Sequence, residues 1–215
     1  KTIYWEYYKQ KQNVLQLLKK EGRIKMNTLE LADMEHVEEY YEIIKMGREF
    51  QQEQGFTQWT EAYPDLNTIR DDIRNQKGYA LKADGKIAGY MCIDFGGEPA
   101  YKEIEGKWRL DGPYAVVHRL AIHTRFRGMG LADSAFRLIE GICRQNMVSI
   151  IRADTDFPNT RMQHILMKNG YANCGTVTFK GGPKLAYDKI LKVEGGHVRK
   201  SACHEPLTYS IIYKN

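Results

Sequence analysis

A short segment in the middle of the chain constrains the fold more than any other. Residues 115–122 predict a β-strand, and a turn containing Gly128 and Gly130 joins this strand to an amphipathic helix over 130–145. Glycines let the backbone approach a ligand closely, and the free N–H groups and dipole at the start of a helix attract anions. Two arginines in the same turn add positive charge. The segment therefore predicts a phosphate or pyrophosphate site built mainly from backbone groups.

Two common phosphate-binding loops do not fit this turn. A Walker A loop requires Gly-Lys followed by Ser or Thr, but Leu131 and Ala132 follow Gly130. The dinucleotide-binding fingerprint requires a third glycine where this chain has Asp133. A plain tight turn before a helix would account for the two glycines alone. The surrounding residues must therefore show whether this turn binds a phosphate.

The remaining predicted elements mix strands and helices. Asp84-Gly85 is a pair that favours a tight β-hairpin turn. Hairpins near both ends and a strand–helix–strand unit in the middle indicate an α/β or α+β sheet domain. Helices are predicted over 32–52, 67–75, 130–145 and 159–169, strands over 24–29, 78–83, 86–94, 115–122, 148–153, 177–179 and 185–190, and a polar insertion over 96–112.

The two ends of the chain differ from the middle. Residues 1–25, which include a predicted amphipathic helix, hold seven Lys/Arg and two Glu and so account for the whole net charge of +5. A basic segment can contact nucleic acid or an acidic partner, but a solvated helix face is the simpler interpretation without a basic, aromatic-lined groove. Residues 192–215 end in an alternating apolar pattern that predicts an extra strand, on this subunit or on a neighbouring one. Both ends are typical of subunit contacts, which leaves a homodimer open.

Composition argues against several classes of protein. No apolar run approaches the ~18 residues of a membrane helix, and the first residues lack the apolar stretch of a signal peptide. The four cysteines are scattered without a CxxC pair, which argues against a zinc ribbon or a disulfide scaffold. This cysteine usage fits a cytoplasmic protein. The histidines have no partners at metal-ligand spacing, so no metal site is predicted.

The residues around the glycine turn resemble a known family. Arg125-Phe126-Arg127-Gly128-Met129-Gly130 is similar to the Arg/Gln-x-x-Gly-x-Gly/Ala signature of the GCN5-related N-acetyltransferase (GNAT) superfamily. The preceding Arg-Leu-Ala-Ile-His resembles the family's fourth strand, and Asn159 with Lys-Asn-Gly-Tyr at 168–171 resembles its second cofactor block. The resemblance covers roughly residues 24–191, and we place the domain at 26–191. It implies a mixed, mostly antiparallel central sheet flanked by helices, with splayed central strands.

The resemblance also implies a reaction and a set of binding residues. Family members transfer an acetyl group from acetyl-CoA, as a co-substrate without a metal, to an amine of a small molecule or peptide by direct attack in a ternary complex. The backbone of Leu120 and Ile122 would pair with the pantetheine arm, and the Ile122 amide would polarise the thioester carbonyl. The cofactor-binding residues carried over by position are Leu120, Ile122, Arg125, Arg127, Gly128, Met129, Gly130, Leu131, Ala132 and Asn159.

Candidates for the base and for the acceptor site follow from their positions. His118 precedes Leu120 by two residues, and an imidazole suits proton transfer near neutral pH, although a packed strand histidine is an equal alternative. Asp94 and Glu98, near the end of the third predicted sheet strand, are weaker alternatives for the base or for amine recognition. Trp59 and Trp108 are candidates to stack on an amine cation, or else they cap the core.

One position departs from the family pattern. Many members carry a Tyr, the general acid for the thiolate, four residues before the glycine that matches Gly170, where this chain has Leu166. The proton would have to come from water or from another group such as Tyr171 or Tyr187. The departure keeps open a second hypothesis, a non-catalytic acyl-CoA-binding sensor or scaffold module.

Overall fold

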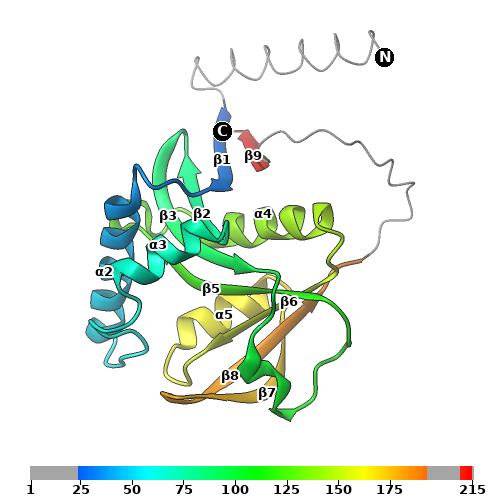
Figure 1. Cartoon of the computed structure of the whole chain (residues 1–215). Helices are drawn as coiled ribbons and strands as arrows, with labels where there is room; N and C mark the ends of the chain where they lie inside the picture. The colour runs from blue at the N-terminus through cyan, green and yellow to red at the C-terminus, as the bar shows by residue number, and fades with distance from the viewer. Residues whose placement is uncertain (1–23, 193–208, 215) are drawn as a thin grey trace, which may run out of the picture.

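The computed structural model describes residues 24–192 and 209–214. The predicted helix near the N-terminus and most of the C-terminal tail lie outside the described residues. In the described part, helices pack on both faces of one sheet (Figure 1). The strands are β1 (Ile24–Leu31), β2 (Gly78–Ala83), β3 (Lys86–Asp94), β4 (Ile104–Gly106), β5 (Tyr114–Ile122), β6 (Ile150–Thr155), β7 (Ala172–Phe179), β8 (Gly182–Ile190) and β9 (Tyr209–Lys214). The helices are α2 (Val37–Glu53), α3 (Leu66–Arg74), α4 (Leu131–Gln145) and α5 (Thr160–Lys168), with single 3-10 turns at Pro99–Lys102 and Thr124–Phe126.

The strands of the sheet lie in the order β4-β7-β8-β6-β5-β3-β2-β1-β9. Neighbouring strands are antiparallel except β5 and β6, which run parallel. The parallel pairing covers only Tyr114–Val117 of β5, and the rest of this strand diverges from β6. These features confirm the predicted mixed, mostly antiparallel sheet with splayed central strands.

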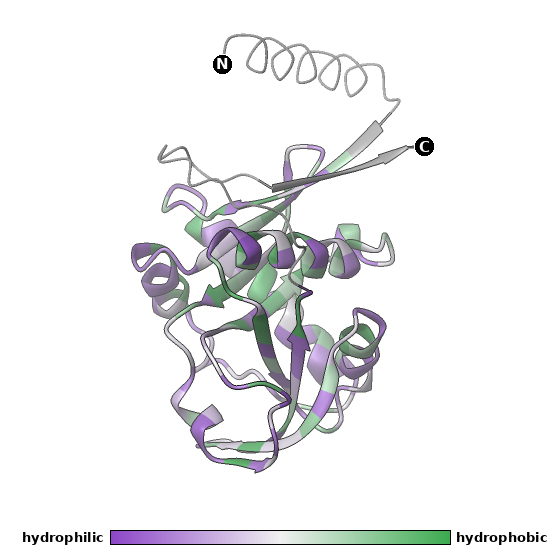
Figure 2. Ribbon diagram, turned by 90° about the vertical axis from the view of Figure 1, so that its right-hand side faces the viewer, coloured by the Kyte–Doolittle hydropathy of each residue, from purple (hydrophilic) through white to green (hydrophobic). Residues whose placement is uncertain are grey.

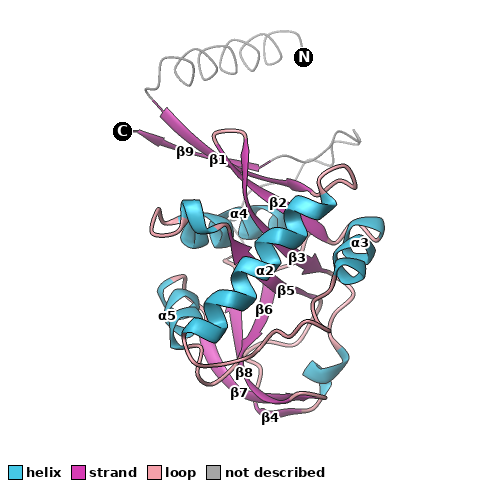
Figure 3. Cartoon of the chain, turned by 90° about the vertical axis from the view of Figure 1, so that its left-hand side faces the viewer, coloured by secondary structure: helices cyan, strands magenta, loops and turns pink. Residues whose placement is uncertain are grey.

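Helices cover both faces of the sheet. On one face, α2 and α3 pack over β2, β3 and the end of β5, and Figure 3 shows α2 crossing this face diagonally. On the other face, α4 and α5 cover the larger hydrophobic core. Figure 2 shows apolar residues concentrated on the central strands and hydrophilic residues on the outer sides of helices. The end of β5 therefore lies between two helical layers. Among the described residues, no helix is long and apolar enough to cross a membrane.

Local sequence explains the elements that border the site. α4 turns its apolar residues toward the sheet, among them Leu131, Phe136 and Ile139, which are all buried. The β2–β3 turn has positive φ at Asp84 and Gly85, +49° and +82°, as a two-residue hairpin turn of this kind requires. The hairpin predicted at this pair is confirmed.

The edges of the sheet differ from the sequence-based expectation. Part of the predicted polar insertion forms β4, which pairs with β7. Gly106 and Gly175 permit this close approach, since a Cβ on Gly175 would overlap the carbonyl oxygen of Glu105. Residues 209–214 form β9, which pairs with β1 of the same chain. The alternating pattern identified the strand but carried no information about its partner.

Candidate active site

The turn between β5 and α4 presents backbone groups rather than side chains. Gly128 and Gly130 have φ values of +79° and +72°, in the left-handed region that favours glycine. Gly130 is the N-cap of α4, so the first N–H groups of this 15-residue helix have no partner within the helix. A Cβ on either glycine would meet no atom within 4 Å and would project into open space. These features form an anion site at the start of α4.

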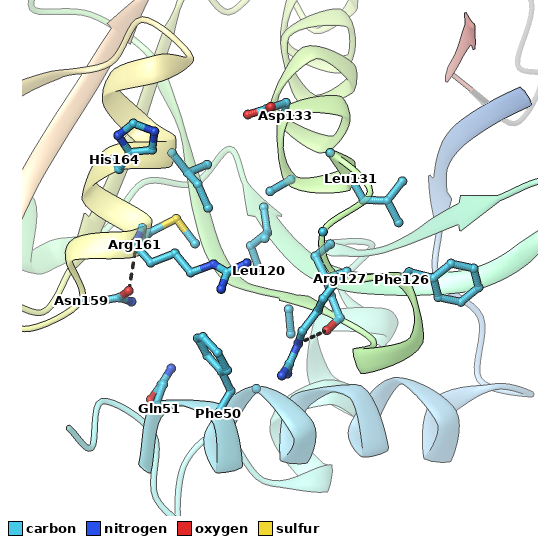
Figure 4. A pocket seen from close by; sticks show the side chains of 18 of the residues that line it. Phe50, Gln51, Leu120, Phe126, Arg127, Leu131, Asp133, Asn159, Arg161 and His164 are labelled. Carbon is cyan, nitrogen blue, oxygen red and sulfur yellow. Dashed lines mark hydrogen bonds between the residues drawn. The ribbon is translucent and has the colours of Figure 1, made fainter. Parts of the chain in front are cut away.

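A groove of about 350 Å³ begins at this turn and follows the end of β5. Its walls come from α4, α5 and the second half of α2 with the loop that follows it (Figure 4). Arg125 and Met129, although they belong to the same turn, do not line the groove. The other predicted cofactor-binding residues do: Leu120, Ile122, Arg127, Gly128, Gly130, Leu131, Ala132 and Asn159.

Strand β5 presents a free backbone edge along the groove. Its pairing with β6 stops at Val117. On its other side a β-bulge interrupts the pairing with β3, because Met91 alone stands opposite both Arg119 and Leu120. A bulge bends the strand that carries it, so β5 turns away from β6 at this point. The backbone of residues 120–122 can therefore pair with an extended ligand as an added strand would.

Asn159 connects the start of α5 to the opposite wall of the groove. Its Oδ1 accepts a hydrogen bond from the backbone N–H of Met162 at 3.1 Å and so caps α5. Its Nδ2 donates to Oε1 of Gln58 at 3.5 Å. A bond of this length is weak, so Nδ2 remains available to a ligand. Gln51 on α2 orders the same loop, because its Oε1 accepts from the backbone N–H of Trp59 at 2.9 Å.

Arg127 and Arg161 bring positive charge to the groove from opposite walls. Arg127 donates from Nη2 to the Met46 carbonyl on α2 at 2.8 Å, and its guanidinium carbon lies 4.7 Å from the centre of the Phe50 ring. The guanidinium carbon of Arg161 lies 5.2 Å from the same ring. Burial lowers the pKa of Arg127, and the charge of Arg161 adds to this effect. Neither arginine forms an ion pair with a carboxylate in the part of the chain that the structure describes. The groove therefore suits an anionic ligand.

His118 and Glu98 lie together beside β5, at the edge of the polar insertion. His118 Nε2 is 3.8 Å from Glu98 Oε2, and both side chains are largely buried. Burial lowers the pKa of His118 to about 3, and the positive charge of Arg119 acts in the same direction. The imidazole is therefore neutral near pH 7 and has one ring nitrogen free as an acceptor, but a pKa this low makes it a weak base in the unliganded protein. Glu98 places a carboxylate where it would stabilise the imidazolium.

Asp94, the last residue of β3, is held by fixed partners. Lys77 Nζ donates to its Oδ2 at 2.8 Å, and the backbone N–H of Gly96 donates to its Oδ1 at 2.7 Å. Burial opposes ionisation of Asp94, but these hydrogen bonds outweigh it and lower the pKa of the carboxyl group. A carboxylate stabilised in this way is a weak proton acceptor, so Asp94 acts as a fixed charge near His118.

Comparison with known proteins identifies the family. The model of the acetyltransferase (GNAT) family matches residues 38–171. A GNAT-family acetyltransferase from Streptococcus agalactiae 2603 is 36% identical, with a TM-score of 0.71, and the match covers 78% of this chain and 96% of that one. The chain belongs to the GNAT family of acetyltransferases.

More distant GNAT structures share the fold. An acetyltransferase from Listeria monocytogenes 4b F2365 is 20% identical, with a TM-score of 0.61 and coverage of 76% of this chain and 94% of that one. Aminoglycoside acetyltransferase AAC(6′)-Ib in complex with coenzyme A and kanamycin is 21% identical, with a TM-score of 0.57 and the same coverage of 76% and 94%. No curated protein sequence matches the chain.

The two candidate tryptophans of this GNAT protein lie in different places. Trp59 lines the groove and packs against Gly47 of α2. Trp108 is buried beneath the insertion, where its Nε1 donates to the Tyr101 carbonyl at 3.0 Å. Its ring lies 4.1 Å from the guanidinium carbon of Arg152. Trp108 therefore stacks on a cation of this chain and does not line the groove.

Leu166, which replaces the usual tyrosine, and the two alternative tyrosines also lie away from the groove. Leu166, Tyr171 and Tyr187 are buried in the core under α4, and none of them lines the groove. Burial raises the pKa of the Tyr171 hydroxyl well above its usual value. The structure thus offers no tyrosine to the groove at the position where GNAT members often carry one.

Two polar pairs in this GNAT protein were not identified from the sequence. Asp154 on β6 accepts a hydrogen bond from the Tyr101 hydroxyl at 2.7 Å, and burial raises the pKa of its carboxyl group. Arg119 on β5 forms an ion pair with Asp72 on α3. Each pair joins elements far apart in the sequence, and no local pattern marks it. Within the described residues, no cluster of His, Cys, Asp or Glu could hold a metal ion.

Proposed function

We propose that this protein is an N-acetyltransferase that moves an acetyl group from acetyl-CoA to a primary amine of a small molecule or peptide. The groove along β5 carries the proposal. It offers an anion site at one end and an unpaired strand edge along its length. Acetyl-CoA has a pyrophosphate followed by an extended, amide-containing arm, which matches that arrangement. The open space beside Gly128 and Gly130 is where a pyrophosphate would have to approach the backbone.

In this proposal, backbone groups hold most of the donor. The N–H groups of residues 128–132 bind the pyrophosphate, and the backbone of Leu120 and Ile122 pairs with the pantetheine arm. Asn159 donates from Nδ2 to an amide carbonyl of the arm. When bound, acetyl-CoA supplies the thioester that the amine attacks. The Ile122 amide donates toward the thioester carbonyl and stabilises the negative charge that develops on its oxygen.

His118 is the proposed base. An alkylamine is protonated near neutral pH, so a proton must leave before its nitrogen can attack. For His118 to accept that proton, directly or through water, the nearby Glu98 carboxylate has to stabilise the imidazolium that burial disfavours. The new C–N bond forms as the C–S bond breaks, and the nitrogen releases its second proton to water as it becomes an amide. The leaving thiolate takes a proton from water, because Leu166 stands where many GNAT members have a tyrosine.

The proposal places the reaction in the cytoplasm and assigns it no metal ion. Cys92, Cys143 and Cys174 are buried free thiols, which fits a reducing compartment. Activity that survives dialysis against a chelator would support the metal-free assignment, and activity restored only by a divalent ion would contradict it.

The first test is the melting temperature with and without acetyl-CoA. At 100 times the dissociation constant, ligand linkage adds ~2.7 kcal/mol of stability. For a chain of this size, a rise of roughly 5–10 °C is expected. Release of CoA thiol with a panel of amines then tests catalysis. The panel includes aminoglycosides, because the distant relative AAC(6′)-Ib was solved with kanamycin, and peptides with free N-termini. No rise in melting temperature at saturating acetyl-CoA would overturn the proposal.

A non-catalytic acyl-CoA sensor is the second candidate function. The observation that favours it is Leu166, which is buried at the position of the usual tyrosine. A sensor would show the rise in melting temperature but no thiol release with any amine of the panel.

A further inference from the structure

The β-bulge of β5 lies immediately before the residues that line the groove. Met91 stands opposite two residues of β5, and the first of these, Arg119, has φ +54°. An L-residue with a long side chain rarely adopts this conformation, so other contacts must maintain it. The bulge lies just after Val117, the last residue of β5 that pairs with β6, so no described strand lies beside residues 120–122 on the β6 side.

The Arg119 side chain supplies such contacts. Its Nε donates to Asp72 Oδ2 at 3.0 Å, and its Nη2 donates to Asp72 Oδ1 at 2.6 Å, which makes a two-pronged ion pair. Its remaining nitrogen, Nη1, donates to the Tyr63 hydroxyl at 2.7 Å. All three guanidinium nitrogens are therefore bound. We call Arg119, Asp72 and Tyr63 the bulge clamp.

The partners of Arg119 are themselves fixed. Asp72 lies on α3, its side chain is 9% exposed, and its Oδ2 also accepts from the Tyr90 hydroxyl at 3.0 Å. Tyr90 is fully buried on β3, the strand that pairs with β5 on both sides of the bulge. Arg119 is thus held against both α3 and the neighbouring strand, and a two-pronged contact resists rotation of its side chain.

The bulge clamp does not touch the groove. Arg119, Asp72 and Tyr63 are absent from the groove lining, whereas Leu120, Ala121 and Ile122 line it. Any effect of the clamp on a ligand must therefore pass through the backbone of β5.

We propose that Arg119 and Asp72 are positioning residues that hold the β5 bulge in the conformation required for binding of the donor. This inference rests on the proposed function, in which the groove takes acetyl-CoA. Without the two-pronged pair, residue 119 relaxes toward ordinary strand geometry. The backbone of Leu120 and Ile122 then shifts away from the register in which it pairs with the pantetheine arm.

The chain offers a matched control. Arg109 in the polar insertion also makes a two-pronged contact with a buried aspartate, through Nε to Asp188 Oδ1 and through Nη2 to the Asp188 carbonyl at 2.8 Å. Neither residue lines the groove. The Arg109 side chain is more exposed than that of Arg119, 42% against 11%, but replacing Arg109 by Lys disturbs the same kind of contact to a buried aspartate without a link to the bulge.

The experiment measures the dissociation constant of acetyl-CoA by isothermal titration on the full chain. The variants are Arg119→Lys, Asp72→Asn and Arg109→Lys, each titrated well below its own melting temperature. Lysine keeps the charge of Arg119 but cannot make the two-pronged contact. We expect Arg119→Lys and Asp72→Asn to raise the dissociation constant about tenfold, a change of ~1.4 kcal/mol. Arg109→Lys should change it less than twofold, even where it lowers the melting temperature equally.

One of these variants could fail to fold, so the experiment also includes a milder substitution, Tyr63→Phe, and a second measurement, amide hydrogen exchange. Tyr63→Phe removes one hydrogen bond from a half-exposed side chain and should raise the dissociation constant two- to threefold. Amide hydrogen exchange of the unliganded protein should show faster exchange at 120–122 in Arg119→Lys and Tyr63→Phe than in Arg109→Lys.

The outcomes separate the two proposals. Wild-type affinity in Arg119→Lys, or equal weakening in Arg119→Lys and Arg109→Lys, would overturn the positioning role while leaving the proposed function intact. A wild-type chain that does not bind acetyl-CoA would remove the proposed function itself. In that case altered exchange at 120–122 would still show that the clamp holds the bulge.

Discussion

The two sides of β5 are built in different ways. The groove side, which we call the donor side, consists of backbone groups: a glycine turn, the start of a helix and an unpaired strand edge. The other side, which we propose takes the amine and call the acceptor side, consists of side chains from β3, β5 and the insertion, with charges set by burial and by fixed partners. A backbone site should tolerate changes of side chain and fail when its conformation changes. A side-chain site should behave in the opposite way.

The strongest test of this difference replaces Gly128 by valine. A β-branched residue is strained at φ +79°, and its Cβ projects into the space beside the anion site. We expect the dissociation constant of acetyl-CoA to rise about 100-fold, measured by titration calorimetry. Gly85→Val is the matched control, because Gly85 has φ +82° and equally open surroundings in the β2–β3 hairpin. Equal affinities of the two variants would contradict the donor assignment.

The corresponding test on the acceptor side is His118→Ala. A positioned general base typically contributes 10²–10⁴-fold, so we expect kcat to fall about 100-fold. Binding of acetyl-CoA should change less than threefold, because His118 does not line the groove. His36→Ala is the control, since this histidine lies at the start of α2, outside the groove lining, and should leave kcat nearly unchanged. A His118→Ala enzyme with wild-type kcat would show that the base is another group.

The same difference explains what the sequence could predict. Most of the predicted cofactor-binding residues line one groove because the strand, glycine turn and helix start are consecutive, and their geometry depends on local backbone conformation. On the acceptor side, residues meet only through the fold. Trp108 has the right chemistry for an amine cation, but Arg152 from a distant strand already occupies its ring. No local pattern places Arg119 beside Asp72, or Asp154 beside Tyr101. The partner of β9 depends in the same way on which edge the fold leaves open.

A third test disturbs the acceptor side without touching the donor side. In Gly175→Ala, the added Cβ would overlap the Glu105 carbonyl oxygen, so β4 and β7 must separate. Overpacking of this kind typically costs ~1–3 kcal/mol. We expect a stability loss in that range by urea denaturation, with unchanged affinity for acetyl-CoA. Gly181→Ala is the control, since nothing lies within 4 Å of its added Cβ. A large loss of donor affinity in Gly175→Ala would show that the two sides are coupled through the sheet.

A fourth test uses pH to examine the burial of His118. The unfolded chain binds a proton on this histidine with a pKa near 6.5, whereas burial lowers the pKa in the folded chain to about 3. Below pH 6.5 the unfolded state therefore binds more protons, and stability falls as the pH drops toward 3. Between pH 7.5 and pH 5.0 the wild type should lose ~2 kcal/mol more than His118→Gln, measured by urea denaturation at both values. Parallel losses in the two proteins would mean that His118 is already accessible to protons in the folded state.

The smallest effect should come from Arg125, and it tests directly whether backbone groups or side chains bind the phosphates. This arginine belongs to the family signature, yet its exposed side chain does not line the groove, and only its backbone is part of the turn. If the anion site is made of N–H groups, Arg125→Ala should raise the dissociation constant of acetyl-CoA less than threefold at physiological salt. The exposed charge acts at long range only, so the difference should shrink further at high salt. A loss as large as that of Gly128→Val would mean that side chains, and not the backbone, hold the phosphates. The contrast between the two sides of β5 would then disappear.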